Sequence, residues 1–114
     1  MSTLKVNTLQ NTSGVEVYTA KAWVNFNGTG TVAIRASGNV SSITDNGTGN
    51  YTINFTNALA DANYSVNVSA HKQTSYEETP YYDVTLLTTS VTVYNVRIGG
   101  TFVDTSSMSV AIFR

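Results

Sequence analysis

The stretch that decides the fold is AWVNFNGTGTVAIRAS, residues 22–37. Apolar side chains occupy every second position on each side of its two glycines: Ala22, Val24 and Phe26, then Val32, Ile34 and Ala36. Because successive side chains of a β-strand point to opposite faces, each run would place its apolar residues on one face of a sheet. The Asn-Gly pair between the runs tolerates the positive φ angles that tight turns require. The stretch therefore predicts a β-hairpin with one buried face.

The same turn sequence, NGTG, occurs at residues 27–30 and again at residues 46–49. Each copy is followed by an alternating run, over residues 31–37 and residues 50–56. A glycine loop that binds phosphate would need a following Gly-Lys-Ser or Gly-Lys-Thr and the start of a helix, and neither copy has them. Both copies are therefore predicted to be hairpin connections.

Further runs with a period of two follow along the chain: Tyr51, Ile53 and Phe55; Tyr64, Val66, Val68 and Ala70; Tyr82, Val84 and Leu86; Tyr94, Val96 and Ile98; Met108, Val110 and Ile112. About seven or eight short strands, with turn signals between them, predict an all-β fold, an antiparallel β-sandwich of the jelly-roll or lectin-like kind. We expect residues 19–114 to form this single domain.

Residues 1–18 differ from the rest because their apolar side chains are few and widely separated. These side chains are Leu4, Val6, Leu9, Val15 and Val17. Such a segment buries little surface by itself. We therefore expect an extended N-terminal arm that intertwines with a neighbouring chain or attaches to a larger assembly.

The composition is that of an ordered β-protein with few charges. Only 11% of the 114 residues are charged, against roughly 25% in an average domain. Thr (18), Ser (12) and Asn (12) supply most of the polar surface. A net charge of −1 gives no broad positive field, so nucleic acid is not an expected partner. The absence of cysteine excludes disulfides, thiolate nucleophiles and zinc sites built from cysteine.

Targeting and membrane signals are missing from the sequence. The first residues lack the apolar run of a signal peptide, and no stretch approaches the roughly 20 apolar residues that span a bilayer. We therefore expect a chain that folds in the cytosol and does not insert into a membrane.

Catalytic and metal-binding patterns are weak. His71 is the only histidine, and no Gly-x-Ser-x-Gly motif supplies a nucleophile, so it is interpreted as an ordinary surface residue. A calcium loop that begins at Asp45 would need glutamate at its twelfth position, where Thr56 stands. Glu77 and Glu78 are adjacent and would point apart in an extended segment, whereas a polysaccharide hydrolase needs paired carboxylates in a groove. We expect no enzymatic activity, no metal and no cofactor.

Residues 71–83 concentrate features that are rare elsewhere in the chain. They contain the only histidine, the only proline and four of the 13 charged residues. They also contain three tyrosines, a residue type that offers recognition surfaces a large, stiff and amphipathic area. The candidate recognition loop at the exposed tip consists of Tyr76, Glu77, Glu78, Tyr81 and Tyr82. The alternative is a long solvated loop with Tyr82 turned into the core.

Trp23 alternates out of phase with the apolar residues around it, so we place it on the opposite face of its strand. A large aromatic residue on an outer face is typical of a subunit interface. The candidate interface residues are Trp23, Leu4, Val6 and Leu9. A sugar-stacking platform is the alternative use of Trp23.

Four segments carry a resemblance to a known family: STLKVNTLQN (residues 2–11), AKAWVNFNGTGTVAIRAS (20–37), VSSITDNGTGNYTINF (40–55) and LADANYSV (59–66). Together they closely resemble a module of fibre-like virion proteins from tailed bacteriophages, especially phages of marine and cyanobacterial hosts. Phe102, Asp104 and residues 107–113 are loosely similar to the last strands of fibre-tip sandwiches and H-type lectin-like domains.

The resemblance implies a small β-sandwich that serves as a virion appendage, usually a homotrimer, and that assembles in the cytoplasm of the host bacterium. The chain leaves no room for a long fibre shaft, so we expect a fibre tip, cap or knob, or a capsid decoration. We thus expect a noncatalytic virion structural protein whose arm binds other virion proteins. The alternative is a carbohydrate-binding module that recognises a host surface glycan.

Overall fold

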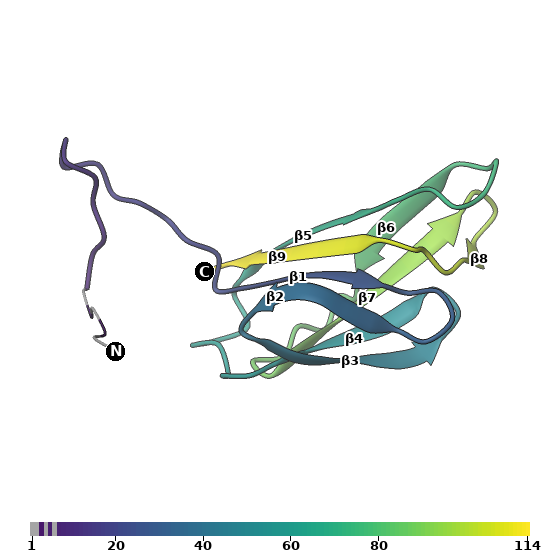
Figure 1. Ribbon diagram of the computed structural model, residues 1–114, viewed down its shortest axis with the longest axis horizontal. Coiled ribbons are helices and arrows are strands. Elements are labelled where there is room, and N and C mark those ends of the chain that lie inside the picture. The colour runs from purple at the N-terminus through teal and green to yellow at the C-terminus, as the bar shows by residue number, and fades with distance from the viewer. Residues whose placement is uncertain (1–2, 4, 6) are drawn as a thin grey trace.

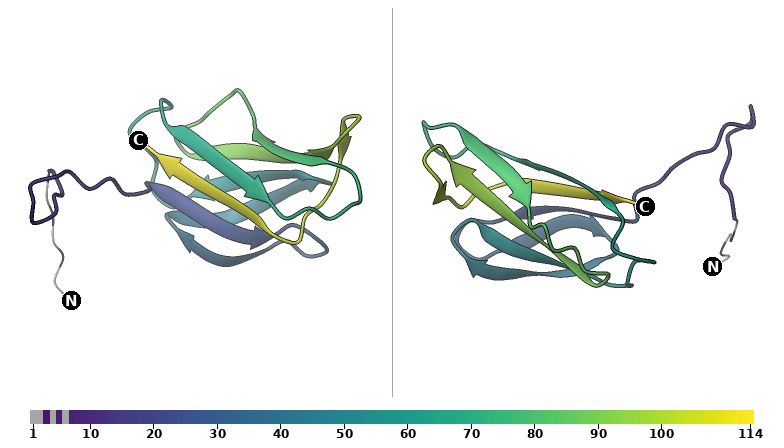
Figure 2. Two further views of the ribbon diagram at one scale, coloured as in Figure 1. Left: turned by 90° about the horizontal axis from the view of Figure 1, so that it is seen from above. Right: turned by 180° about the vertical axis from the view of Figure 1, so that it is seen from behind.

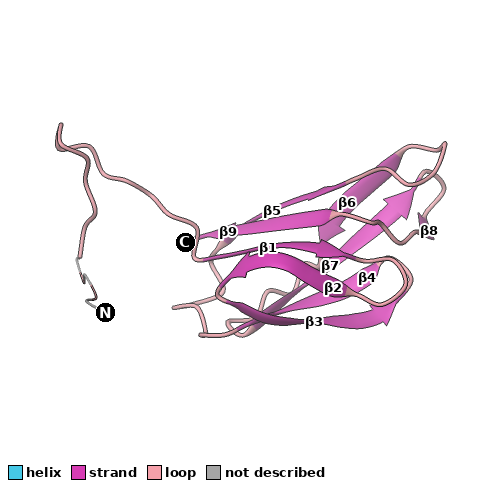
Figure 3. Ribbon diagram, in the orientation of Figure 1, coloured by secondary structure: helices cyan, strands magenta, loops and turns pink. Residues whose placement is uncertain are grey.

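The structure, a computed structural model, describes residues 3, 5 and 7–114. This part of the chain is all-β, with no helix and with nine strands in two antiparallel sheets that pack face to face (Figure 1, Figure 3). The predicted β-sandwich is confirmed. A search of the same residues finds no helix with the length and hydropathy needed to cross a membrane.

The two sheets differ in their strand order. Sheet one has the order β2 (Ala33–Gly38), β1 (Ala22–Asn27), β9 (Met108–Phe113) and β5 (Ser65–Ala70). Sheet two has the order β3 (Val40–Gly47), β4 (Asn50–Phe55), β7 (Ser90–Arg97) and β6 (Glu78–Tyr82). The short strand β8 (Thr101–Phe102) pairs with the end of β7. The chain therefore crosses between the sheets several times, which makes the two layers mutually dependent.

Both copies of NGTG form hairpin connections, as predicted. The first copy joins β1 to β2, and the second joins β3 to β4 through the two turn residues Thr48 and Gly49. Gly49 has a φ of +63°, and a Cβ at this position would lie 2.6 Å from the backbone oxygen of Asn95. The backbone conformation and the available space therefore both require glycine at position 49.

The core lies between the sheets and is built mainly from β1, β4, β7 and β9. Its buried apolar side chains are Ala22, Val24, Phe26, Val40, Tyr51, Ile53, Phe55, Tyr64, Val91, Val93, Met108, Val110 and Ile112. The inward faces predicted for β1, β4 and β9 are confirmed. Phe26 and Tyr51 meet edge to face across the layers, with ring centroids 5.2 Å apart. Full burial of each large apolar side chain stabilises the fold by about 1.5–3 kcal/mol.

The inward face predicted for β7 is wrong. Tyr94 and Val96 lie on the outer face, and Ile98 lies beyond the strand and is 68% exposed. The side chains that point inward are Val91, Val93 and Asn95. The sequence of β7 is apolar at positions of both phases, so alternation alone does not select a face. Asn95 can be buried because its amide nitrogen donates to Glu78 Oε2 at 3.1 Å and to the backbone oxygen of Val103 at 3.2 Å.

The inward position predicted for Ala36 in β2 is also wrong. A β-bulge opposite β1 interrupts the alternation, because Asn25 pairs with Ala36 while its neighbour Phe26 pairs with Ile34. Arg35 is the extra residue of the bulge. Ile34 therefore packs against the core, whereas Ala36 is exposed on the outer face.

The run predicted for residues 82–86 ends early, because β6 stops at Tyr82. Asp83 Oδ1 accepts a hydrogen bond from the backbone N–H of Thr85 at 2.9 Å, and this local turn leads the chain out of the sheet. Val84 is consequently 94% exposed. Tyr82 shares the inner face of β6 but is 42% exposed at the rim, so it is not a core residue.

Residues 7–19 of the N-terminal arm lie outside the sandwich (Figure 1, Figure 2). All of residues 7–19 are exposed, and the chain enters the sandwich at Lys21, whose N–H donates to the backbone oxygen of Ile112 at 2.7 Å. The arm and the C-terminus therefore meet the sandwich at the same pole. Leu4 and Val6, two of the predicted interface residues, lie outside the described residues.

The arm contains a small β-hairpin, which we call the arm hairpin (residues 9–17). Gln10 and Glu16 form an antiparallel bridge, and the N–H of Val17 donates to the backbone oxygen of Leu9 at 2.6 Å. Asn11 shapes the turn, because its side-chain oxygen accepts hydrogen bonds from two backbone N–H groups beyond it. The arm hairpin thus has local hydrogen bonds, although all of its residues are exposed.

Candidate functional site

Residues 71–83 do not form one continuous loop. Their second half is β6, an edge strand that pairs with β7 over Glu78–Tyr82. Pro80 is compatible with this position because an edge strand has one side that forms no ladder hydrogen bonds. Tyr81 and Tyr82 point to opposite faces of the strand. The predicted recognition residues are therefore distributed over three separate environments.

Tyr76 and Glu77 belong to the loop that precedes β6. The Tyr76 ring is 54% exposed, and the guanidinium carbon of Arg97 lies 5.0 Å from its centroid, a cation–π contact. Glu77 is exposed, and its backbone oxygen accepts a hydrogen bond from the N–H of Ile98 at 2.8 Å. These contacts fasten the loop to the end of β7.

Glu78 fastens the same loop from the inside. Its Oε1 accepts hydrogen bonds from the backbone N–H of Gln73 at 3.0 Å and of Thr74 at 2.6 Å, and its Oε2 accepts one from Asn95. Burial opposes ionisation of this carboxyl, but the hydrogen bonds from Thr74, Asn95 and Gln73 outweigh burial and lower its pKa. Glu78 is therefore engaged within the chain, and we assign it a structural role.

Tyr81 belongs to a row of aromatic rings on the outer face of sheet two. Its ring centroid lies 4.9 Å from that of Tyr94 on β7, which in turn lies 5.7 Å from that of Phe102 on β8. We call Tyr81, Tyr94 and Phe102 the aromatic shelf. The side chains of Tyr81 and Phe102 are 39% and 43% exposed, so the shelf presents ring surface to solvent.

Asp83 lies at the rim of the aromatic shelf. Its Oδ2 accepts a hydrogen bond from the Tyr94 hydroxyl at 2.6 Å, which lowers the pKa of Asp83 and raises that of Tyr94. Asn50, Tyr82 and Val84 complete a shallow hollow of about 520 Å³ over the shelf. The hollow thus combines aromatic ring surface with one fixed carboxylate and one amide.

Sequence reasoning missed two of the three shelf residues. The alternation in β7 predicts that Tyr94 points into the core, and Phe102 lies in a strand of only two residues. The signal that could have found them is the cross-strand pairing of β6 with β7, which places Tyr81 directly opposite Tyr94.

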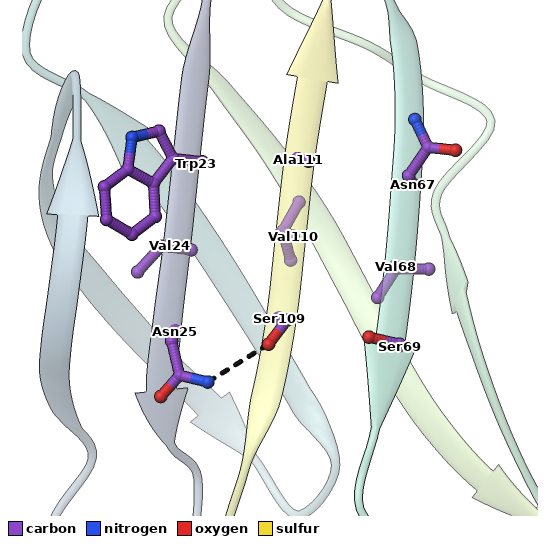
Figure 4. A pocket seen from close by; sticks show the side chains of 9 residues that line it. All are labelled: Trp23, Val24, Asn25, Asn67, Val68, Ser69, Ser109, Val110 and Ala111. Atoms are coloured by element: carbon purple, nitrogen blue, oxygen red, sulfur yellow. Dashed lines mark hydrogen bonds between the residues drawn. The ribbon is translucent and has the colours of Figure 1, made fainter. Parts of the chain in front are cut away.

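Trp23 lies on the outer face of sheet one, as predicted, and is 42% exposed. Its indole packs over Gly38 of β2, where a Cβ would come within 2.3 Å of the indole nitrogen. Small and mostly polar side chains lie to one side of it on β1, β9 and β5, and these strands form a shallow hollow of about 410 Å³ (Figure 4). We call this surface the Trp23 face; its outward residues are Trp23, Asn25, Asn67, Ser69, Ser109 and Ala111.

The Trp23 face is almost uncharged. In the four strands of sheet one, all of which the structure describes, Arg35 is the only charged residue. Its guanidinium group bonds to Asn25 Oδ1 and to the backbone oxygen of Ser106, so the charge is held at one end of the face. Asn25 in turn donates to Ser109 Oγ at 3.1 Å (Figure 4). The polar groups of the face are thus partly satisfied by one another.

Two other titratable side chains, His71 and Asp104, make local contacts. The ring nitrogen Nδ1 of His71 lies 2.7 Å from the side-chain nitrogen of Gln73. Asp104 accepts hydrogen bonds from the Tyr51 hydroxyl and from the N–H of Gly49. Among the described residues, no group of three or more His, Cys, Asp or Glu side chains is arranged to hold a metal ion.

Comparisons with protein-family models, with curated proteins and with solved structures found no significant match to this chain.

Proposed function

We propose that this protein is a noncatalytic structural component of a bacteriophage particle, a β-sandwich that forms a homotrimer and is held to other virion proteins by its N-terminal arm. It would form a fibre tip or decorate the particle surface after assembly in the bacterial cytoplasm. The resemblance of roughly residues 2–70 to fibre-like virion proteins supports the phage origin and the trimer. The exposed arm hairpin is the observation that carries the proposal.

The arm hairpin needs a surface to pack against. Its apolar side chains Leu9, Val15 and Val17 are 42%, 60% and 41% exposed, and the adjacent Tyr18 is 76% exposed. An isolated two-stranded hairpin is marginally stable at best in water. A partner surface that covers these side chains would stabilise the hairpin, and a neighbouring virion protein is the partner that we propose.

The Trp23 face has the properties of a subunit interface. Burial of an unpaired charge is unfavourable, and this face carries a single charged residue, Arg35, which is held at one end of the face. The small side chains of Ser109 and Ala111 on the central strand allow a second sheet to approach closely. Trp23 beside them supplies a large aromatic contact, a residue type that is enriched at interfaces.

Light scattering on the purified full-length chain tests the oligomer. We expect a mass about three times the 12.2 kDa of one chain at micromolar concentration. Trp23→Glu should dissociate the trimer because it would bury an unpaired carboxylate. The matched control is Ile98→Glu, which changes an exposed apolar residue elsewhere and should leave the mass unchanged. A monomeric wild-type chain would contradict the proposal.

Deletion of residues 1–18 tests the arm. The sandwich should keep its fold, since none of its core residues belongs to the arm. We expect the truncated chain to be missing from purified phage particles in a complementation assay, whereas the full-length chain is incorporated. Incorporation of the truncated chain at the wild-type level would refute the attachment role.

A further inference from the structure

The outer face of sheet two is neutral and polar beyond the aromatic shelf. Asn54 donates to Ser42 Oγ at 3.1 Å and to Thr44 Oγ1 at 2.9 Å. Asn46 donates to Thr52 Oγ1 at 2.8 Å. The hydroxyl oxygens of Thr52 and of Thr92 on β7 lie 3.0 Å apart. This flat surface of amides and hydroxyls leads along β4 and β7 towards the ring of Tyr94. The shelf is therefore the apolar end of a polar, uncharged face.

We infer that the aromatic shelf, with Asp83 and Asn50 at its rim, is a binding site for a neutral saccharide. This inference adds a second activity to the proposed assembly role and does not depend on it. A sugar ring has an apolar face of C–H groups that can lie on an aromatic ring, and hydroxyl groups at its edge that need polar partners. The hollow offers both kinds of group side by side.

Asp83 and Asn50 have hydrogen-bonding capacity that the chain itself does not use. The Asp83 carboxylate has about four acceptor sites, and within the chain it accepts from Tyr94 and from the N–H of Thr85. Asn50 accepts from Asn46 at 3.2 Å, and its amide nitrogen donates to nothing among the described residues. A ligand hydroxyl could therefore accept from Asn50 and donate to Asp83. Such a pair of contacts suits a polyhydroxyl ligand.

The charges at the hollow favour a neutral ligand. The lining contains no lysine or arginine, and its single charge is the Asp83 carboxylate. A phosphorylated, sulfated or sialylated ligand would be repelled by this carboxylate and would find no cation to bind.

The shelf is also preorganised. Its three rings are carried by paired strands, and the hydroxyl of Tyr94 is fixed by its hydrogen bond to Asp83. A site on rigid strands loses little conformational entropy when a ligand binds. Tyr76 is excluded from the site, because it contacts Arg97 and does not line the hollow.

The test is a ¹H–¹⁵N NMR titration of the full-length protein. The probes are neutral gluco-, manno-, galacto- and chito-oligosaccharides, each added to about 10 mM so that dissociation constants near 1 mM are detected. We expect at least one probe to shift the amide signals of Tyr81, Asp83, Tyr94 and Phe102. The absence of a response to every probe would overturn the inference, as would shifts confined to the Trp23 face.

Variants then assign the binding to the shelf. Tyr81→Ala and Phe102→Ala should each weaken binding roughly tenfold, which corresponds to about 1.4 kcal/mol. Tyr81→Phe keeps the ring and should retain binding, and Tyr76→Ala is the matched control that should leave affinity unchanged. An equal loss in Tyr76→Ala, or tighter binding of a sialylated or sulfated probe, would refute the site. The trimer mass of the shelf variants should stay unchanged, so a failure here is distinct from a failure of the assembly role.

Discussion

The hydroxyl of Tyr51 links three loops at one end of the sandwich, and we expect Tyr51→Phe to lower the free energy of unfolding by about 2 kcal/mol. Tyr51 is fully buried, and its hydroxyl lies 2.9 Å from the backbone oxygen of Gly28 and 2.9 Å from Asp104 Oδ1. Asp104 also accepts from the N–H of Gly49 at 2.8 Å. The hydroxyl therefore links the loop between β1 and β2, the turn between β3 and β4, and the segment that follows β8.

The magnitude follows from the type of hydrogen bond that is lost. Burial, reinforced by the Asp104 carboxylate, raises the pKa of Tyr51, so the hydroxyl stays protonated and acts as a donor. A hydrogen bond to a charged group contributes about 1.5–3 kcal/mol. Asp104 keeps its bond from Gly49 in the variant, so the expected loss lies in the lower half of this range. For a domain of this size, such a loss lowers Tm by about 8 °C.

Urea unfolding followed by circular dichroism measures the change. Wild type and variant are compared at one protein concentration, because the stability of an oligomer depends on concentration. The matched control is Tyr64→Phe, whose hydroxyl donates to the neutral backbone oxygen of Leu87 at 2.8 Å and should contribute only about 1 kcal/mol. The reasoning is refuted if Tyr51→Phe and Tyr64→Phe destabilise the protein equally.

Two further predictions concern the turns and the chain end. Gly30→Ala should lower the free energy of unfolding by about 1–2 kcal/mol, because φ is +59° there but no atom lies within 4 Å of the new Cβ. Gly49→Ala should lower it by more, because its methyl group would also clash with Asn95; equal urea midpoints for the two variants would contradict this. The hydrogen bonds from Arg114 and from the backbone N–H of Asn63 lower the pKa of Asp61 from 3.8 to about 2. Because the folded pKa is the lower one, this ion pair stabilises the fold above about pH 4 and is lost as the pH falls towards 2. Arg114→Ala should therefore make Tm fall less steeply as the pH is lowered from about 4 to 2. A fall of Tm equal to that of the wild type would contradict a stabilising role of the ion pair.

The fold could be predicted from the sequence wherever one phase of a strand was apolar and the other was not. In β1, Val24 and Phe26 alternate with tryptophan and asparagine, and both the buried face and the outward position of Trp23 follow from this pattern. In β7, apolar residues occupy both phases, and the choice between them depends on what packs on each side. Val93 faces the opposite sheet, whereas Tyr94 is paired across the strand with Tyr81.

The aromatic shelf could not be predicted for a related reason. Tyr81 and Phe102 are 21 positions apart in the sequence and are brought together only because β7 lies between β6 and β8. Strand order depends on long-range pairing, which no local pattern encodes. The bulge at Arg35 is a similar case, because one extra residue in β2 reverses the face of Ala36 without any change in the alternation of the sequence.

The position of the two chain ends determines how the protein can be modified. The arm and Arg114 share one pole, whereas β8 and the turn before it lie at the other (Figure 1). A peptide or dye attached after Arg114 would therefore lie at the pole where the arm leaves the sandwich. An insertion between Gly99 and Gly100, both exposed and both at positive φ, would instead be displayed at the far end. If the arm is fixed to a particle, that turn is the place from which foreign sequences would project outward.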